Sequence, residues 1–250
     1  MATGSSAAKA EPLCVLALHG FGGNPRELEP MLERVRAVGF DVVAPLLPGH
    51  GTEPRDLQER RFDEWVAFAR EGFDDARRRY DRVVVLGFSM GSLVAMSLAV
   101  ERDVSGLVVL GNALHLSRPL RAAFGAFDLL KLRPPDLYVP KPRPADMEDQ
   151  AAARALTNYD RHPLRAALEV HRAAAKLRHQ VHRIQARTLI LHGAKDRVCP
   201  VENATWLAAK IPHPTVRIYP RSAHVVAADY DRDAVSADVI TFLREISAGR

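Results

Sequence analysis

Short continuous apolar runs alternate along this chain with longer segments that are apolar on one side only. Apolar runs bounded by charge or glycine are typical of strands buried in a parallel sheet. The longer segments have helical spacing and end at breakers, as 25–38 ends at Gly39. The expected strands are 13–18, 41–44, 83–86, 104–110, 188–193 and 215–219, and the expected helices are 25–38, 62–80, 92–100, 201–211 and 229–246. This alternation predicts an α/β fold with a mostly parallel central sheet flanked by helices.

The alternation stops between residues 113 and 186, where no convincing strand pattern is present. Segments 120–132, 146–156 and 163–184 have helical spacing, whereas the five prolines of 133–144 exclude regular helix. An all-helical insertion in an α/β chain is expected to lie over the carboxyl ends of the strands, where such sheets bind ligands. We therefore predict a disordered leader at 1–12, a core formed by 13–112 and 187–250, and a helical cap or lid at 113–186, inserted after the strand at 106–111.

Composition sets a few limits on the class of protein. The chain has 250 residues, 47% hydrophobic and 26% charged, as in ordinary soluble domains. No apolar run approaches the ~20 residues of a membrane span, so we expect no stable membrane insertion. The first eleven residues lack the apolar segment of a secretory signal. Cys14 and Cys199 have no zinc-ligand spacing and form no disulfide framework, so a cytoplasmic location is the simplest expectation.

The net charge is +5, and the densest basic run is Arg77-Arg78-Arg79 followed by Arg82. Such a cluster is one feature of nucleic-acid binding proteins. The alternative is a solvated helix end, where cations also suit the helix dipole. The cluster lacks the repeated aromatic residues on which bases stack, so we favour the second interpretation and expect no nucleic-acid partner.

One short motif carries a specific chemical prediction. Gly87-Phe88-Ser89-Met90-Gly91 follows the apolar run 83–86 and precedes the helical segment 92–100. Strand, G-x-S-x-G and helix is the context of the nucleophile elbow, in which a strained turn lifts the serine hydroxyl off the sheet. The flanking glycines avoid clashes, and the amide after the serine lies at a helix N-terminus, where negative charge is favoured. Ser89 is therefore the predicted nucleophile, the alternative being a tight turn between a core strand and a core helix.

The loop that follows the first strand, His19-Gly20-Phe21-Gly22-Gly23-Asn24, is rich in glycine. A dinucleotide-binding G-x-G-x-x-G would need glycine where Pro25 stands, so that reading fails. The better interpretation is the loop that supplies an oxyanion-hole amide, from Phe21, in addition to the amide of Met90. The Phe21 side chain is also a candidate wall of the acyl pocket.

An elbow serine requires an acid and then a histidine later in the chain. Asp196 and His224 each come just after a predicted strand, in that order. His50, in a loop rich in Pro and Gly, precedes the serine and is instead expected near the mouth of the site. Ser89, Asp196 and His224 are thus the predicted catalytic triad. The histidines of 113–186 form no metal-ligand pattern, and no metal site is expected.

These segments together resemble the α/β-hydrolases of the carboxylesterase and monoacylglycerol-lipase type. The matching stretches are 18–24, 48–51, 87–91, 191–196 and 222–224, spread over nearly the whole chain from Leu13 onward. The likeness is weak in the predicted cap, which sets substrate choice. Ser92 is a minor departure, since many relatives carry glycine there.

The resemblance implies a serine hydrolase that cleaves short to medium acyl esters or monoacylglycerols through an acyl-enzyme on Ser89, without metal or organic cofactor. Thioesterases, acyltransferases and C–C hydrolases use the same fold, so they stay open as alternatives. An aminopeptidase is less favoured, although Asp146, Glu148 and Asp149 are candidate anchors for a substrate amine. The oligomeric state stays open.

The predicted cap is expected to wall an apolar acyl pocket. Its first helical segment carries more large apolar residues than docking of a short surface helix requires, including Phe124 and Phe127. We predict that these two phenylalanines, with Phe21 and His50, contact the substrate. The alternative is that the phenylalanines only attach the cap to the core.

Overall fold

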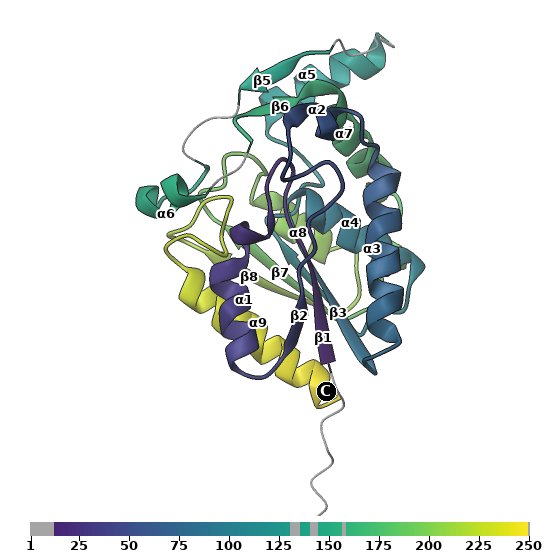
Figure 1. Cartoon of the computed structure of the whole chain (residues 1–250), viewed down its shortest axis with the longest axis vertical. Helices are drawn as coiled ribbons and strands as arrows, with labels where there is room; N and C mark the ends of the chain where they lie inside the picture. The colour runs from purple at the N-terminus through teal and green to yellow at the C-terminus, as the bar shows by residue number, and fades with distance from the viewer. Residues whose placement is uncertain (1–12, 131–135, 141–144, 157–158, 250) are drawn as a thin grey trace, which may run out of the picture.

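The computed structural model describes residues 13–130, 136–140, 145–156 and 159–249. A parallel six-stranded sheet in the order β2-β1-β3-β4-β7-β8 runs through its middle (Figure 1). Its strands are β1 (Leu13–Leu18), β2 (Asp41–Val43), β3 (Arg82–Phe88), β4 (Gly106–Leu110), β7 (Thr188–Gly193) and β8 (Pro214–Tyr219). The predicted α/β fold with a mostly parallel central sheet is therefore confirmed.

Helices cover both faces of the sheet, as Figure 1 shows for α3 on one side and α1 and α9 on the other. One face packs against α3 (Phe62–Arg77), α4 (Met90–Glu101) and α8 (Glu202–Ala208), and the other against α1 (Glu29–Ala37) and α9 (Arg232–Ser247). Another helix, α7 (Leu164–Arg178), packs against α3 and α4. Within β1, Cys14, Leu16 and Leu18 belong to the first core and Leu13, Val15 and Ala17 to the second. This period of two on a strand buried on both faces explains its uninterrupted apolar run.

Several element boundaries differ from the expected ones for local reasons. The expected helix 25–38 begins as a 3₁₀ turn (Pro25–Glu27), whose N-cap Asn24 accepts a hydrogen bond from Arg26 N, before α1 starts at Glu29. The short helix α2 (Pro54–Gln58) lies in a loop rich in breakers and was not predicted. In α3 the aromatic stripe that includes Trp65 and Phe73 is buried, as predicted.

The segment between β4 and β7 lies at the carboxyl ends of the strands, at the top of Figure 1. It contains α5 (Arg118–Leu129), β5 (Tyr138–Pro140), α6 (Gln150–Ala155), β6 (Arg161–Pro163), α7 and a 3₁₀ turn (Val181–Arg183). The expectation that this segment holds no strand is wrong, because β5 and β6 pair as a two-stranded antiparallel sheet. Three-residue strands are too short to produce a readable alternation, and each contains a proline, which an edge strand tolerates.

One helix of this segment is shorter than expected. The helix expected at 146–156 is confined to Gln150–Ala155, because the Asp149 side chain accepts a hydrogen bond from Ala152 N and so caps the helix late. Much of the proline-rich stretch 133–144, and the leader 1–12, lie outside the described residues.

The arginine cluster lies at the end of α3 and the start of β3, where its side chains contact neighbouring groups. Arg77 donates to the carbonyls of Tyr80 and Asp81, Arg78 pairs with Asp75, and Arg82 donates to the Ile246 carbonyl. Arg77 and Arg78 therefore contact groups at and just beyond the C-terminal end of α3, where cations suit the helix dipole, and Arg82 contacts the last turn of α9.

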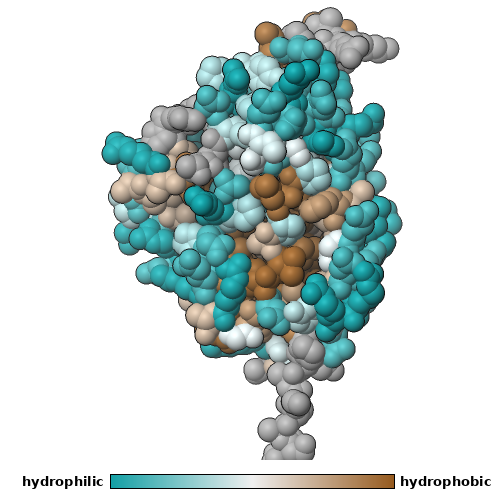
Figure 2. Space-filling model, viewed as in Figure 1, coloured by the Kyte–Doolittle hydropathy of each residue, from teal (hydrophilic) through white to brown (hydrophobic). Residues whose placement is uncertain are grey.

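Hydrophilic side chains cover much of the face shown in Figure 2, and an apolar patch lies in its middle, over the edge strand β2. Among the described helices, none is long and apolar enough to cross a membrane.

Candidate active site

Ser89 occupies a strained turn between β3 and α4, with φ of 52° and ψ of −118°. A non-glycine residue in this region costs roughly 1–3 kcal/mol and persists only where the surroundings impose it. Here the Ser89 amide donates to the Leu110 carbonyl of β4 at 3.0 Å, and the Ser89 carbonyl accepts from Ser92 N at 3.0 Å and Ser92 Oγ at 2.5 Å. The two sides of the turn are therefore held by β4 and by the first turn of α4.

The flanking glycines are required because backbone approaches them closely. A Cβ atom at Gly87 would lie 2.2 Å from the Gly91 carbonyl oxygen, and one at Gly91 would lie 2.2 Å from the Leu18 carbonyl oxygen. Neither contact is possible for a real side chain, so the G-x-S-x-G spacing is a packing requirement of this strand–turn–helix junction.

His224 lies in the loop after β8 and reaches the serine from across the sheet. Its Nε2 atom is 2.9 Å from Ser89 Oγ and its Nδ1 atom is 2.7 Å from Asp196 Oδ2. The ring is almost entirely buried and packs against Phe88, with 5.0 Å between ring centroids. At Gly193, the end of β7, a Cβ atom would lie 2.1 Å from the Ala223 carbonyl oxygen, so the strand and the histidine loop approach as closely as glycine allows.

Asp196 follows β7 and its side chain is fully buried. Its Oδ1 accepts hydrogen bonds from the amides of Val198 (2.9 Å) and Cys199 (2.7 Å). Its Oδ2 lies between two histidines, 2.7 Å from His224 Nδ1 and 3.0 Å from His192 Nε2. The carboxylate is thus oriented by two amides and aimed at the Nδ1 side of the His224 ring.

Asp196 and His224 each favour the charged form of the other and so shift each other's pKa. Burial by itself raises the pKa of Asp196, but the charge and hydrogen bonds of His224 and His192 outweigh it, so the pKa lies well below its ordinary value. Burial by itself lowers the pKa of His224, but the adjacent Asp196 carboxylate outweighs it, so the pKa lies above its ordinary value of 6.5. A carboxylate paired with a basic imidazole suits removal of a hydroxyl proton.

The glycine-rich loop after β1 forms a tight turn from Gly20 to Gly23, closed by a 3.2 Å hydrogen bond from Gly23 N to Gly20 O. Gly22 has φ of 63°, a conformation that favours glycine. Phe21 is therefore at the tip of a fixed turn. Met90 is the first residue of α4, where the amides have no partner within the helix.

A cavity of about 220 Å³ opens in front of the Ser89 and His224 side chains. Its lining is mostly apolar and comes from both the core and the segment 113–186, with Phe21, Leu116, Leu120, Phe124, Val170 and Val198 among the wall residues. Two predicted contact residues, Phe21 and Phe124, therefore face the same space as the triad.

The other two predicted contact residues lie elsewhere, since neither His50 nor Phe127 is among the described residues that line the cavity. His50 is buried behind Phe21 and meets the His19 ring edge-on at 4.8 Å. Burial lowers its pKa to about 4. Its ring packs against Phe21 and Trp65. A buried histidine in a Pro-Gly loop looks the same in sequence as one at a pocket mouth, so the sequence could not separate the two. Phe127 is half-buried on α5, three residues beyond Phe124.

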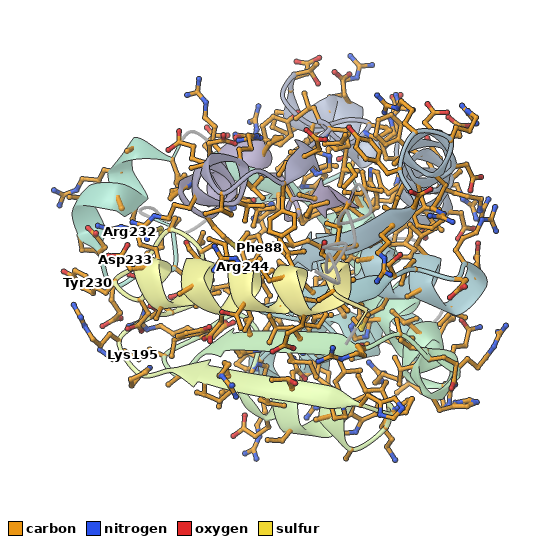
Figure 3. All side chains as sticks on the ribbon, turned by 90° about the horizontal axis from the view of Figure 1, so that it is seen from below. Phe88, Lys195, Tyr230, Arg232, Asp233 and Arg244 are labelled. Atoms are coloured by element: carbon orange, nitrogen blue, oxygen red, sulfur yellow. The ribbon has the colours of Figure 1, made fainter. Side chains whose placement is uncertain are left out.

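Sequence reasoning missed two buried carboxylates near the triad. Glu27 lines the cavity, and fully buried Asp229 accepts hydrogen bonds from four amides: Ala223, Tyr230, Glu148 and Asp149. Asp229 therefore connects the loop that carries His224 to residues 148–149, which come just before α6. Figure 3 shows Tyr230 just before α9 and Arg232 and Asp233 at its start. Asp229 follows the apolar run 225–228 and resembles an ordinary cap in sequence, whereas Glu27 lies between Arg26 and Leu28 with no sequence signal of burial.

Within the described parts of the chain, no group of three or more His, Cys, Asp or Glu side chains is arranged to hold a metal ion.

Comparison with known proteins places the chain in a family. Residues 10–231 match the family model described as serine aminopeptidase, S33, and the chain belongs to this family of α/β-hydrolases. It is 29% identical over 230 residues to a thermostable monoacylglycerol lipase of Bacillus sp. (strain H-257), covering 90% of this chain and 87% of that one. It is 23% identical over 235 residues to a carboxylesterase of Bacillus subtilis (strain 168), covering 93% and 92%.

Solved structures share the fold. One described among two metagenome-derived lipolytic enzymes, LipS and LipT, has a TM-score of 0.84 at 22% identity, over 94% of this chain and 95% of that one. A monoacylglycerol lipase of Paleococcus ferrophilus has a TM-score of 0.78 at 17% identity, over 95% of each chain. The predicted α/β-hydrolase fold is therefore confirmed.

Proposed function

We propose that this protein is a serine hydrolase that cleaves carboxylic esters through an acyl-enzyme on Ser89. One observation carries the proposal. The Ser89 hydroxyl, the His224 ring and the Asp196 carboxylate form a continuous hydrogen-bonded series, and the serine faces a mostly apolar cavity. The names of the relatives, a monoacylglycerol lipase and a carboxylesterase, support the same class of reaction.

The reaction begins when His224 Nε2 accepts the Ser89 proton and Oγ bonds to the ester carbonyl carbon. The imidazolium that forms is stabilised by Asp196, whose carboxylate is held by the Val198 and Cys199 amides. His224 then donates the proton to the departing alkoxide, leaving an acyl-enzyme and a free alcohol. A water molecule gives a proton to His224 and attacks the acyl carbon. The bond from Ser89 Oγ to that carbon then breaks, His224 returns the proton to Oγ, and the carboxylic acid leaves.

The amides of Phe21 and Met90 are the proposed oxyanion hole. Phe21 belongs to the Gly20–Gly23 turn, and Met90 begins α4, where the helix dipole favours negative charge. Each such donor contributes roughly 3 kcal/mol of barrier lowering.

The segment 113–186 is the proposed cap, with the core formed by 13–112 and 187–250. Support comes from its contribution of Leu116, Leu120, Phe124 and Val170 to the walls of the cavity. The volume of about 220 Å³ lies below the ~300–1,000 Å³ of pockets for drug-sized ligands, which favours short to medium uncharged acyl groups.

An aminopeptidase activity is the second candidate, because the family model bears that description. A substrate amine would require a carboxylate at the cavity, and two line it: Glu27, which is buried and accepts a hydrogen bond from Gly20 N, and Asp146. However, Arg197 binds both Asp146 and Glu148. Since these carboxylates already neutralise a guanidinium, they are poor anchors for an ammonium group, and ester hydrolysis is favoured.

Two buried free thiols, Cys14 and Cys199, are compatible with the proposed reducing, cytoplasmic location.

A substrate panel tests the proposal. Purified protein is assayed with p-nitrophenyl esters and matched thioesters of graded chain length, with monoacylglycerols, and with aminoacyl p-nitroanilides. The proposal predicts the highest kcat/KM on oxygen esters. Higher kcat/KM on thioesters would indicate a thioesterase, and preference for the anilides would indicate the aminopeptidase.

A further inference from the structure

Glu27 is a buried carboxylate at the centre of the site that the proposed triad mechanism does not use. It is the last residue of the 3₁₀ turn that follows the glycine-rich loop, and only 3% of its surface is exposed. It lines the same cavity as Ser89 and His224. Acidic side chains are almost never buried without a specific partner, so its place calls for an explanation.

The Glu27 carboxylate contacts both ends of the Gly20–Gly23 turn. At one end its Oε2 accepts a hydrogen bond from Gly20 N at 3.2 Å. At the other end it lies against the bare Cα of Gly23, where a Cβ atom would be 2.2 Å from Oε2 and 2.5 Å from Oε1. The two glycines thus leave the space that the carboxylate fills.

The turn is held from the opposite side by the proposed cap. Tyr159 N donates to the Gly22 carbonyl at 3.1 Å, and the His162 ring lies where a Gly22 side chain would be. Phe21 is therefore fixed between two supports, one from Glu27 and one from 159–162. Without Glu27, Gly20 N loses an acceptor and the turn loses the packing at Gly23.

We propose that Glu27 is a positioning residue that holds the Gly20–Gly23 turn so that the Phe21 amide points at the oxyanion. This inference rests on the proposed function, since it assumes that Phe21 supplies an oxyanion-hole amide. Glu27 therefore lowers the energy of the transition state and not that of the bound substrate, because the Phe21 amide is needed most when the carbonyl oxygen gains charge.

The Glu27 carboxylate also acts electrostatically on His224, and substitutions can separate this action from the positioning of the turn. Burial lowers the pKa of His224, whereas the Asp196 carboxylate raises it. The Glu27 carboxylate also raises this pKa, by a smaller amount. A glutamine at 27 keeps the acceptor for Gly20 N and most of the volume but removes the charge. A leucine removes the acceptor as well.

The test compares Glu27→Gln, Glu27→Leu and the control Glu29→Gln, which alters a partly exposed residue paired with Arg36. We expect Glu27→Gln to keep kcat within about threefold, with the acid limb of its pH profile displaced to lower pH. We expect Glu27→Leu to lose tenfold or more in kcat, up to the ~10²–10³-fold loss of a whole oxyanion donor, with KM little changed. Inhibition by a trifluoromethyl ketone should weaken in parallel, because its adduct carries the same oxyanion.

Two results overturn the inference: full kcat in Glu27→Leu, or an equal loss in Glu27→Gln. Should Glu27→Leu fail to fold by circular dichroism, Glu27→Asp replaces it, because the shorter side chain withdraws from Gly20 N while keeping the charge. Full kcat in Glu27→Asp would then reject the inference. Ser89→Ala is run in the same assay, because residual activity there rejects the proposed function itself, whatever Glu27 does.

Discussion

The Nε2 atom of His224 lies 2.9 Å from the Ser89 hydroxyl, although 135 positions separate the two residues in the sequence. The contact crosses three strand pairings of the sheet, from β3 through β4 and β7 to β8. It exists because parallel strands end at one edge, where the loops after β3, β7 and β8 meet.

The pH profile tests the role of His224. Only the neutral ring accepts the serine proton, and the Asp196 carboxylate holds the pKa of His224 above 6.5 despite its burial. The ring therefore stays protonated to higher pH than a free histidine, and kcat/KM should rise with pH through a midpoint above 6.5. A pH-stat assay from pH 5 to 9 measures this. A midpoint below 6.5, or a flat profile, contradicts the assignment.

The Asp196→Asn variant is the matched test of the same ion pair. It removes the charge that raises the pKa of His224, so the midpoint should fall, and kcat should drop by about 10⁴ through loss of the correct tautomer. An unchanged midpoint would show that Asp196 does not set the basicity of His224.

The two phenylalanines of α5 are expected to differ. Phe124 lines the cavity, whereas Phe127 is not among its described lining residues. Phe124→Ala should therefore change the relative kcat/KM for short and long acyl esters by about 1–3 kcal/mol for the better substrate. Phe127→Ala serves as the control and should leave the chain-length profile unchanged. Equal shifts in both variants would reject the proposed pocket wall.

Asp229 should be important for stability. Its buried carboxylate accepts four amide hydrogen bonds, and Asp229→Ala leaves those amides without their acceptor, so we expect a loss of several kcal/mol in the free energy of unfolding. The control is Asp233→Ala, a change at an exposed residue paired with Arg34, which should cost at most about 1 kcal/mol. Urea unfolding measures both, and equal costs would contradict this account of the loop.

Glycine substitutions test the packing of the elbow. A Cβ atom at Gly91 would lie 2.2 Å from the Leu18 carbonyl oxygen, so Gly91→Ala should prevent correct folding or abolish activity. At Gly125, in α5, no atom of the described residues outside the helix's own backbone lies within 4 Å of the added Cβ, and alanine should be neutral or stabilising by up to about 1 kcal/mol. A fully active Gly91→Ala protein would show that the close approach is not needed.

The sheet, and the meeting of Ser89, Asp196 and His224 at one edge of it, could be predicted because their signals are local. Several strands, such as β1 and β4, are continuous apolar runs, and Ser89, Asp196 and His224 each lie in the loop that follows a strand. The register that brings Asp196 against His224 depends on long-range packing, such as the approach of Ala223 to Gly193. That contact has no signature in sequence beyond the glycine itself.

The proposed cap was predicted less well, for physical reasons. Its strands β5 and β6 have three residues each, which is too short for a period of two to appear. The contrast between Phe124 and Phe127 depends on how α5 packs, and both are equally apolar in sequence. Glu27 was missed and His50 was expected at the mouth of the site, because burial of a polar residue depends on its surroundings, which sequence spacing does not reveal.

Covalent labelling of Ser89 is the most direct test of the central claim. The protein and its Ser89→Ala and Ser92→Ala variants are treated with a fluorophosphonate, and the modified peptide is identified by mass spectrometry. We predict one phosphonylated residue, Ser89, with loss of labelling and of ester hydrolysis in Ser89→Ala, while circular dichroism and thermal unfolding stay those of a folded protein. Ser92→Ala should still be labelled at Ser89. Persistent labelling or hydrolysis in the Ser89→Ala protein would contradict the account.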